Sequence, residues 1–418
     1  MIIKLLTATA LFDGHDVSVN LFRRLLQRRG AEVIHLGHNR SVREVLTVAI
    51  QEDVDALLIS SYQGGHNEYF RFLVDQLREY GAEEKQIFGG GGGVILPSEI
   101  KALEEYGVTK LYHAVDGQRL GINGIADDII RRINENKPKI QSKWLRDLSD
   151  ELLINNSPEK HYLISKQITF IEEQLSSRAD ADELRRKIQK YDKGKSLVIG
   201  FTGPGGCGKS SLIDEVIGRF LAYAPKISIA VLASDPTKST TGGALLGDRI
   251  RYNHIYDDRV FFRSFATRNS GSDVGQYVRD SINLLKTCGF DLIFVETPGI
   301  GQGDSQIKSL TDYSVYVMTA EFGAPSQLEK IDMLDLANYI VINKFEKIGS
   351  EDALREVIIH YIRTHQLKVP RGIPLENLDL PIFACSSNQF NNHGVNKFFK
   401  ALLKLLLETK GGDYGVKE

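Results

Sequence analysis

The sequence predicts an α/β protein with two parallel sheets, each covered by helices on both faces, joined by a helical linker. Short segments that are apolar throughout alternate with amphipathic ones, as strands of a buried parallel sheet alternate with helices. A charged stretch with a mainly helical pattern, 136–195, interrupts this alternation once. The length of 418 residues suits two or three domains of about 150 residues each. We therefore expect one domain at 1–135, a linker at 136–195 and a second domain at 196–410.

The first domain is expected to hold five parallel strands in the flavodoxin-like (Rossmann-like) order. Its first helix has Val17, Leu21 and Leu25 at helical spacing and should end near Gly30. The next helix opens with Ser41-Val-Arg-Glu, a capping box. Such a sheet binds its ligand at the carboxyl ends of the strands. The expected strands are 2–11, 31–37, 55–61, 86–89 and 109–114.

The second domain carries a phosphate-binding loop. The segment GPGGCGKS at 203–210 fits G-x-x-x-x-G-K-[ST] and lies between a strand and a helix, as in P-loop NTPases. Its glycines let backbone N–H groups and the helix N-terminus approach phosphates. We expect Lys209 to reach the β- and γ-phosphates and Ser210 to bind Mg²⁺. The expected nucleotide-binding residues here are Gly203, Gly205, Gly206, Cys207, Gly208, Lys209, Ser210 and Ser211, and the expected strands are 196–203, 227–234, 291–297, 313–320, 338–344 and 381–387.

Polar residues follow the later strands of this domain. Asp235 follows one strand, and Glu296 begins E-T-P-G where many GTPases have D-x-x-G. The segment NKFE at 343–346 resembles the guanine-reading N-K-x-D, with Asn343 on the base edge, Lys344 over the ring and Glu346 on the N1 and N2 donors. Glutamate is one methylene longer than aspartate, so we expect GTP to be preferred over ATP by less than an aspartate would give. Ser386 is expected at the same site.

Three further segments resemble the metallochaperone-type P-loop GTPases that serve adenosylcobalamin-dependent mutases. They are SDPTKSTTGGALLGDRIRY (234–252), FFRSFATRNSGSDVG (261–275) and VETPGIGQGD (295–304). The resemblance covers about 190–410 and implies that Asp235, Asp248 and Glu296 arrange Mg²⁺ and the hydrolytic water. It also implies that Lys209, Asp248 and Glu296 are catalytic and that segments around 237–251 and 300–308 act as switches.

The turn after the first strand carries Asp13, His15 and Asp16. Asp13-Gly-His15, Ser60-Ser-Tyr62 and Gly92-Gly93 together resemble the cobalamin-binding pattern of the mutases. A neutral imidazole is a good cobalt ligand, and an acceptor on its other nitrogen fixes its tautomer. The resemblance implies His15 on cobalt, with the displaced benzimidazole tail bonded by Ser60 in a slot where Gly92 and Gly93 leave room. The expected cofactor-binding residues are Asp13, His15, Ser18, Ser60, Tyr62, Gly92 and Gly93; Ser18 stands where the pattern has Gly, and Tyr62 where it has Leu.

The segments DGHDVS, SSYQGGH and FGGGGGVI are similar to one branch in particular, the fused isobutyryl-CoA mutases. In these, a cobalamin domain is followed by a GTPase domain and then a substrate-binding barrel. The resemblance implies adenosylcobalamin, Mg²⁺ and GTP or GDP as cofactors, GTP hydrolysis that gates cofactor loading, and radical interconversion of isobutyryl-CoA and n-butyryl-CoA in the complete assembly. The barrel does not follow the second domain here, so we expect a fused or separate barrel as partner, and a homodimer.

Composition excludes several classes. The net charge of −2 argues against a nucleic-acid partner. Cys207, Cys288 and Cys385 are widely spaced, which argues against disulfides and a cysteine-ligated zinc site and favours the cytoplasm. The absence of an apolar run of ~20 residues argues against a membrane span.

Other interpretations stay open. The chain is alternatively a stand-alone GTPase-regulated cobalamin delivery protein. A corrinoid methyl carrier usually has a helical cap before its first strand, and a metal site could form from Asp13, His15 and His66. A phosphorelay receiver is discounted, because it needs an aspartate where Ser60 stands. The histidines of HLGH, 35 and 38, are expected on the surface at a strand end.

Overall fold

The computed structural model divides into two compact units. The first comprises Met1–Lys190, Asp235–Ile250 and Phe261–Ser281; the second comprises Tyr191–Ser234, Arg251–Val260 and Ile282–Glu418. Two stretches that the sequence assigns to the second domain, 235–250 and 261–281, therefore cluster with the first unit. The residues that the structure describes are 2–137, 158–174, 182, 185, 186, 188, 196–235, 244–246, 248–266, 273–297, 307–323, 328, 331–369 and 373–417.

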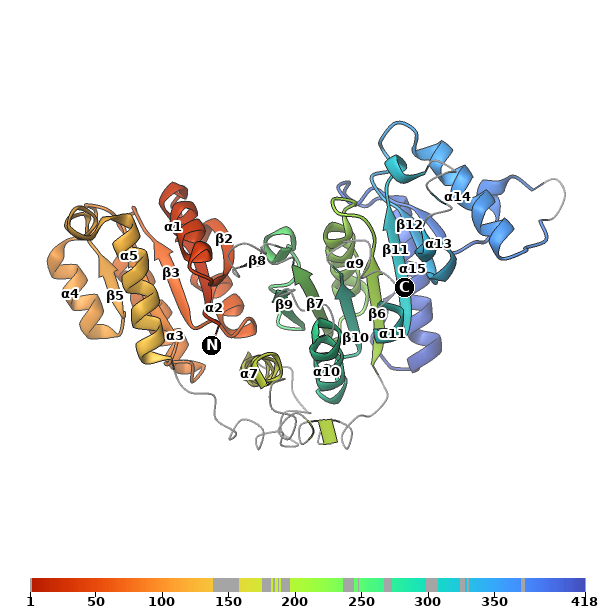
Figure 1. Ribbon diagram of the computed structural model, residues 1–418. Coiled ribbons are helices and arrows are strands. Elements are labelled where there is room, and N and C mark those ends of the chain that lie inside the picture. The colour runs from red at the N-terminus through yellow and green to blue at the C-terminus, as the bar shows by residue number, and fades with distance from the viewer. Residues whose placement is uncertain are drawn as a thin grey trace. The chain divides into compact units, whose positions relative to one another are not determined.

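The first unit is built on a parallel sheet with the order β5-β4-β3-β1-β2-β8 (Figure 1). Its first five strands have the flavodoxin-like order that the sequence predicts. The sixth strand, β8, is unexpected: it pairs Leu245 with Val33 and Leu246 with Ile34 of β2. The strands are β1 (Lys4–Ala10), β2 (Glu32–Arg40), β3 (Ala56–Ser60), β4 (Gln86–Gly90), β5 (Lys110–Tyr112) and β8 (Leu245–Leu246).

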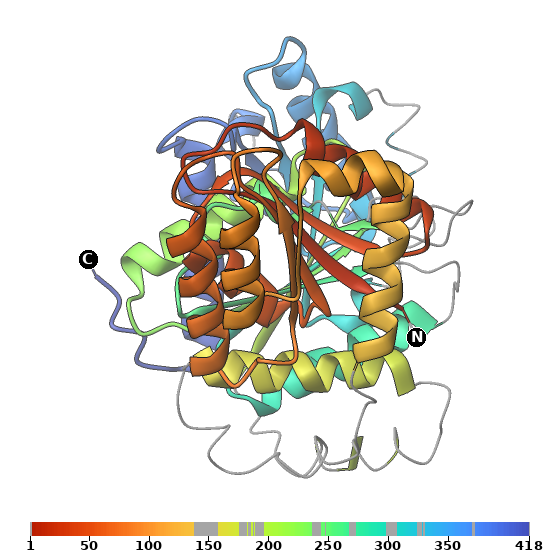
Figure 2. The same ribbon diagram turned by 90° about the vertical axis from the view of Figure 1, so that its left-hand side faces the viewer.

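Helices cover both faces of this sheet (Figure 2). α1 and α5 pack together on one face, and α2, α3 and α4 lie side by side on the other. The capping box at Ser41 and Glu44 is confirmed. The bounds are α1 (Val17–Arg28), α2 (Val42–Gln51), α3 (His66–Glu79), α4 (Pro97–Tyr106) and α5 (Ala114–Asn136).

The apolar positions of α1 divide between core and surface. Leu25 is buried, whereas Val17 is 80% and Leu21 is 41% exposed. Leu26 of α1 and Val33 of the neighbouring β2 are fully buried in the same core, to which α5 also contributes. The helix is confirmed, but its exposed end carries apolar side chains at the carboxyl edge of the sheet.

β2 continues to Arg40, beyond the expected end at residue 37. His35 therefore lies inside the strand, half-buried, with its Nδ1 3.0 Å from Thr7 Oγ1. Burial lowers the pKa of His35 to about 4. The expectation that it is a surface residue is wrong, whereas His38 is exposed as expected.

Part of the predicted linker is described as the helix α7 (Pro158–Gln174), which packs on α2 within the first unit. Three consecutive residues at the carboxyl end of α2, Gln51, Glu52 and Asp53, are all buried there. The rest of the linker, including Trp144, lies mostly outside the described residues.

The second sheet has the order β13-β12-β11-β6-β10-β7-β9. Its strands are β6 (Leu197–Thr202), β7 (Ile229–Asp235), β9 (Val260–Ala266), β10 (Leu292–Glu296), β11 (Tyr313–Met318), β12 (Tyr339–Ile342) and β13 (Ile382–Ala384); β9 was not predicted. The helices are α9 (Lys209–Tyr223), α10 (Asp273–Thr287), α11 (Ile307–Leu310), α13 (Asp332–Leu336), α14 (Ser350–Thr364) and α15 (His393–Lys410), with short 3-10 turns η2 (Asp248–Arg251), η4 (Ala320–Phe322) and η5 (Leu375–Asn377).

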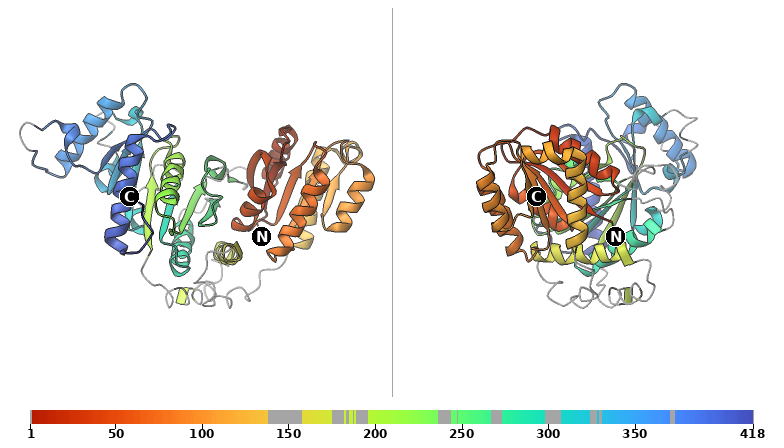
Figure 3. Two further views of the ribbon diagram at one scale, coloured as in Figure 1. Left: turned by 180° about the vertical axis from the view of Figure 1, so that it is seen from behind. Right: turned by 60° about the vertical axis from the view of Figure 1, so that its left-hand side comes forward.

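In the second unit, α9 and α15 pack on each other along one face of the sheet (Figure 3). The rings of Phe220 and Phe399 meet there edge to face, 5.0 Å apart. Because β6 is central and α9 follows it directly, the loop between them opens at the carboxyl edge of the sheet, where ligands of such folds bind. None of the described helices is both long and apolar enough to cross a membrane.

Candidate functional site

His15 presents one ring nitrogen outward while a buried carboxylate holds the other. Asp13 is fully buried, and its Oδ1 accepts from the His15 backbone N–H at 2.9 Å and lies 2.8 Å from His15 Nδ1. The imidazole itself is 69% exposed. This is the hydrogen bond that the D-x-H spacing predicts, and it leaves Nε2 available to a metal.

The other oxygen of Asp13 accepts from the backbone N–H of Tyr62. Burial opposes ionisation of Asp13, but the donors of Tyr62 and His15 outweigh it and hold the pKa of Asp13 below its ordinary value. One carboxylate therefore joins the loop after β1 to the loop after β3. The ring of Tyr62 in turn lies 5.4 Å from the ring of His15.

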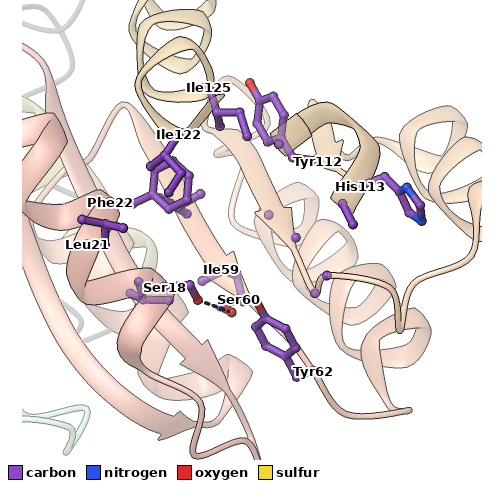
Figure 4. Close-up of a pocket in the computed structure, with 18 residues that line it drawn as sticks. Ser18, Leu21, Phe22, Ile59, Ser60, Tyr62, Tyr112, His113, Ile122 and Ile125 are labelled. Atoms are coloured by element: carbon purple, nitrogen blue, oxygen red, sulfur yellow. Dashed lines mark hydrogen bonds between the residues drawn. The ribbon is translucent and has the colours of Figure 1, made fainter. Parts of the chain in front are cut away.

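A pocket of about 260 Å³ opens beside Tyr62 at the carboxyl edge of the first sheet (Figure 4). Ser18 and Ser60 line it, with their hydroxyl oxygens 3.4 Å apart. Pockets that enclose a whole drug-sized ligand usually measure roughly 300–1,000 Å³, so this one suits a single arm of a larger molecule. The apolar lining residues are Val19, Leu21, Phe22, Leu58, Ile59, Ile122 and Ile125.

The glycine run at the end of β4 lets backbone approach backbone. A Cβ on Gly91 would stand 1.8 Å from the carbonyl oxygen of Ser61, and one on Gly89 would stand 2.6 Å from that of Ile59. Gly92 has φ +59° and lies against the ring of Tyr62. Gly92 lines the pocket; Gly93 does not, and a Cβ on Gly93 would meet nothing within 4 Å.

The sequence reasoning missed the aromatic and apolar wall of this pocket. Phe22 belongs to α1, and Tyr112, His113 and Ile125 come from β5 and α5. Phe22 is one turn after the predicted Ser18, so helical spacing could have found it. The residues of β5 and α5 reach the site only through the sheet order.

The alternative metal site is not assembled. His66 is buried, with its Nε2 3.1 Å from Glu99 Oε2 and its Nδ1 3.2 Å from Gln63 O. Among the described residues, no group of three or more His, Cys, Asp or Glu side chains is placed to hold a metal ion.

The P-loop of the second unit has the backbone that its glycines permit. Gly206 and Gly208 have φ of +78° and +90°, and a Cβ on Gly203 would stand 1.9 Å from Val317 O. Lys209 and Ser210 open α9 and are nearly fully buried. Lys209 Nζ donates to the carbonyl oxygens of Gly203 and Pro204 at 2.9 and 3.2 Å, inside the loop.

Glu296, at the end of β10, is tied to the first turn of α9. Ser210 Oγ donates to its Oε1 at 2.8 Å, and the hydroxyl of Tyr252 donates to its Oε2 at 2.7 Å. Tyr252 ends the segment 234–252 that carries the family resemblance, but the sequence assigns it no role. It lies 44 residues before Glu296, so no local motif points to it.

Asn343 joins the P-loop to the loop after β13. Its Nδ2 donates to Cys207 O at 2.9 Å and to Ser387 Oγ at 3.0 Å, and its Oδ1 accepts from Ser387 N at 3.2 Å. Both ends of this amide therefore contact protein. In this structure the Asn343 side chain bonds the P-loop and the loop after β13, whereas the sequence predicts it on the base edge.

Lys344 contacts the P-loop, and Glu346 contacts the loop after β13. Lys344 Nζ donates to Gly206 O at 2.7 Å, which draws its stem across the P-loop. Asn388, which the sequence reasoning missed, donates to Glu346 Oε1 at 3.0 Å. Burial opposes ionisation of Glu346, but hydrogen bonds from Ser386 and Asn388 hold its pKa below the ordinary value.

The remaining predicted acids are described only in part. Asp235 closes β7 and is 4% exposed. Asp248 opens η2, but its side chain lies outside the described residues. The expected switch segments fall largely on 236–243 and 298–306, which are outside them too.

The residues present fit both groups that the sequence implies. An imidazole oriented by a buried carboxylate suits cobalt. The pocket beside it, apolar with two hydroxyls, suits an aromatic tail. For Mg²⁺, a serine hydroxyl and a carboxylate meet in the first turn of a P-loop helix, and oxygen ligands shared with phosphates are what this ion takes.

Comparison with known families agrees with this geometry. Residues 164–400 match the model of the methylmalonyl-CoA mutase-associated GTPase MeaB. The chain belongs to this GTPase family. Residues 3–114 match the B12 binding domain. This MeaB-family chain thus carries a cobalamin-binding domain before its guanine-nucleotide-binding domain.

Relatives of this MeaB-family chain are named fused isobutyryl-CoA mutase. That of Geobacillus kaustophilus is 47% identical over 99% of this chain and 37% of its own length. Those of Cupriavidus metallidurans and Nocardia farcinica are 46% and 43% identical, each over 97% of this chain and 36% of their own length. The chain therefore spans little more than a third of these relatives.

Proposed function

We propose that this chain is the cobalamin-carrying and GTPase-chaperone portion of an adenosylcobalamin-dependent acyl-CoA mutase that interconverts isobutyryl-CoA and n-butyryl-CoA. GTP hydrolysis in the second unit gates loading of the cofactor. The observation that carries the proposal is the outward imidazole of His15, held by buried Asp13 beside a pocket sized for one arm of cobalamin.

In the first unit, His15 supplies Nε2 to cobalt, and Asp13 keeps Nδ1 engaged so that the ring neither turns nor changes tautomer. Ser18 and Ser60 supply hydroxyls to the benzimidazole tail inside the pocket. The adenosyl group of the cofactor is the source of radical chemistry when it is bound. The protein's task at this site is to hold the corrin and its tail.

In the second unit, the P-loop wraps the phosphates, and Lys209 moves from the loop carbonyls onto them. Ser210, Glu296, Asp235 and Asp248 supply oxygens to Mg²⁺ and the water. Lys344, Glu346 and Ser386 read guanine. The substrate barrel, fused or separate, is the partner, and we expect a homodimer in the cytoplasm.

Cobalt ligation tests the proposal directly. The protein would be prepared with ¹⁵N-histidine, loaded with cobalamin and reduced to Co(II), and the nitrogen hyperfine splitting read by EPR. Coupling to histidine nitrogen is expected. Coupling to the benzimidazole nitrogen alone would refute His15 as the ligand.

A second experiment separates the mutase portion from a stand-alone delivery protein. The cobalamin-loaded chain would be mixed with a substrate barrel subunit and assayed with isobutyryl-CoA. The proposal expects a stable complex that isomerises the substrate. Transfer of cobalamin to the barrel with loss of the chain from the complex would favour the delivery protein.

A further inference from the structure

The hydroxyl of Tyr252 contacts the carboxylate at the centre of the nucleotide site. It donates to Glu296 Oε2 at 2.7 Å, while Ser210 donates to Oε1 at 2.8 Å. Tyr252 is 2% and Glu296 is 3% exposed. Burial and the adjacent Glu296 raise the pKa of Tyr252 well above its ordinary value, so the phenol remains a donor.

The two residues after Tyr252 are hydrogen-bonded to α9, the helix that follows the P-loop. Asp214 of α9 accepts from the backbone N–H groups of Asn253 and His254, both at 2.9 Å, and from Asn253 Nδ2 at 3.1 Å. Asp214 is itself 3% exposed. The segment is therefore fixed to α9 by a buried carboxylate.

Side-chain packing supports the same attachment. The ring of His254 lies over Gly218, where a Cβ would stand 2.7 Å from His254 Nε2. His254 Nδ1 is 3.2 Å from Asp214 Oδ1. A glycine in the middle of a helix lowers the stability of that helix. Here the missing Cβ of Gly218 leaves room for the imidazole ring of His254.

We propose that Tyr252 is a positioning residue for Glu296: it holds one carboxylate oxygen so that the other faces Ser210 and the Mg²⁺ of the bound nucleotide. The contacts form a closed ring, from Ser210 to Glu296 to Tyr252, along the chain to His254, and through Asp214 back to α9. This inference rests on the proposed GTPase function and adds a residue to it.

The fixed oxygen has a specific consequence. A carboxylate whose two oxygens are both free rotates and presents either oxygen to a metal or a water. With Oε2 held by Tyr252, the plane of the Glu296 carboxylate is set before the nucleotide arrives. Groups that orient a metal ligand in this way typically contribute 10–100-fold in metal affinity or activity.

The variant Tyr252→Phe tests this, because it removes the hydroxyl and keeps the ring. We expect kcat for GTP to fall roughly 10–100-fold and the Mg²⁺ concentration that half-saturates nucleotide binding to rise by a similar factor. Affinity for a fluorescent GTP analogue measured in EDTA should stay within about twofold. A purely structural role would lower kcat, the apparent affinity for Mg²⁺, the nucleotide affinity in EDTA and the stability together.

Tyr277→Phe is the matched control. Tyr277 is 3% exposed and its hydroxyl donates to Ala266 O at 3.1 Å, so this change also removes a buried hydroxyl, one whose acceptor is a backbone carbonyl and not Glu296. It should leave kcat and the Mg²⁺ dependence unchanged. Asp214→Ala, which frees the segment from α9, should reproduce the defect of Tyr252→Phe.

Three outcomes would overturn the proposal: unchanged Mg²⁺ dependence in Tyr252→Phe, an equal loss in Tyr277→Phe, or a loss of EDTA affinity as large as the loss of kcat. If the unmodified chain failed to hydrolyse GTP, the proposed GTPase function would fail instead. The Mg²⁺ dependence of equilibrium binding would still decide the role of Tyr252.

Discussion

At the scale of single residues, Asp13 is the side chain on which the proposed cobalamin site depends. It is fully buried and accepts from His15 twice and from the Tyr62 backbone. Asp13→Ala should weaken cobalamin binding by about 10–100-fold. The imidazole loses the acceptor that orients it, and the loops after β1 and β3 lose the carboxylate that connects them. Titration of the absorbance change on cobalamin binding measures this.

The control for Asp13 is the other acid of the same turn. Asp16, the N-cap residue of α1, accepts at Oδ2 from Asn20 Nδ2 at 3.1 Å. Asp16→Asn should bind cobalamin as the unmodified protein does. Equal weakening by both changes would show that charge in the turn, not the hydrogen bond to His15, is what matters.

Residues close together in sequence could be predicted, and residues joined only by the fold could not. The D-x-H spacing predicted the Asp13–His15 bond because the two residues share one turn. Tyr252 and Asn388 contact Glu296 and Glu346 across 44 and 42 residues, and no periodicity encodes such pairs. The hydrogen bond from Asn343 to the P-loop carbonyl of Cys207 also joins distant residues and could not be predicted.

At the scale of elements, the same limit applies to strands. β1 to β5 are apolar runs between helices, so their pattern predicted the sheet order. β8 has two residues, too few for any period, and is recognised only by its pairing with β2. A buried charge pair joins this part of the chain to α2: Arg249 and Glu52 are both fully buried, 3.1 Å apart.

Removing one member of this pair should be costly. Arg249 also donates to Gln51 Oε1 at 2.5 Å and to Phe262 O at 3.0 Å. Arg249→Met should lower the free energy of unfolding of the first unit by about 3–5 kcal/mol, because it leaves Glu52 buried without its cation. Urea denaturation followed by circular dichroism measures the loss.

The exposed ion pairs of Arg131 provide the comparison. Its side chain is 54% exposed and bonds Asp128 and Glu135 along α5. Arg131→Met should change the free energy of unfolding by less than about 1 kcal/mol. Similar losses of unfolding free energy for Arg131→Met and Arg249→Met would show that burial does not set the contribution of these ion pairs.

The helix α7 should make the first unit sensitive to acid. His161 is 5% exposed, with its ring 5.4 Å from that of Phe261 and its Nδ1 3.3 Å from Gln51 Nε2. Burial lowers the pKa of His161 to about 3. Because the folded histidine stays neutral while the unfolded one binds a proton near pH 6.5, stability is full above that pH and falls as the pH drops toward 3.

At pH 5, protonation of this histidine in the unfolded chain should lower the free energy of unfolding by about 2 kcal/mol relative to its value well above pH 6.5. His161→Gln should remove that part of the pH dependence, and free energies of unfolding at pH 7, 6 and 5 would reveal a flatter slope. His38→Gln, at an exposed position of the same unit, should leave the slope unchanged. An unaltered slope in His161→Gln would mean that the histidine is protonated in the folded state.

At the scale of the whole molecule, neither unit is one continuous piece of sequence. The first unit takes Asp235–Ile250 and Phe261–Ser281 from within the region that matches the GTPase family. Domain boundaries drawn along the sequence therefore cut through a packed unit. Alternation of strands and helices predicts where domains are, but not which segments cross between them.

Because the first unit includes segments beyond residue 190, we expect Glu52→Gln to change stability differently in the full chain and in a fragment of residues 1–190. In the full chain, Glu52 accepts from Arg249 and from the Ser264 backbone N–H at 3.1 Å. Glu52→Gln should cost about 3–5 kcal/mol there, because Arg249 keeps a buried charge without its partner.

In a fragment that ends at residue 190, both partners are missing, Glu52 meets water, and the same change should be nearly neutral. The fragment should also unfold at a lower urea concentration than the first unit of the full chain, since it lacks β8 and the segment around Ser264. Parallel urea titrations of the two lengths, each with and without Glu52→Gln, form a complete cycle. An equal effect of the substitution in both lengths would mean that its cost does not come from the pairing of Glu52 with Arg249 and Ser264.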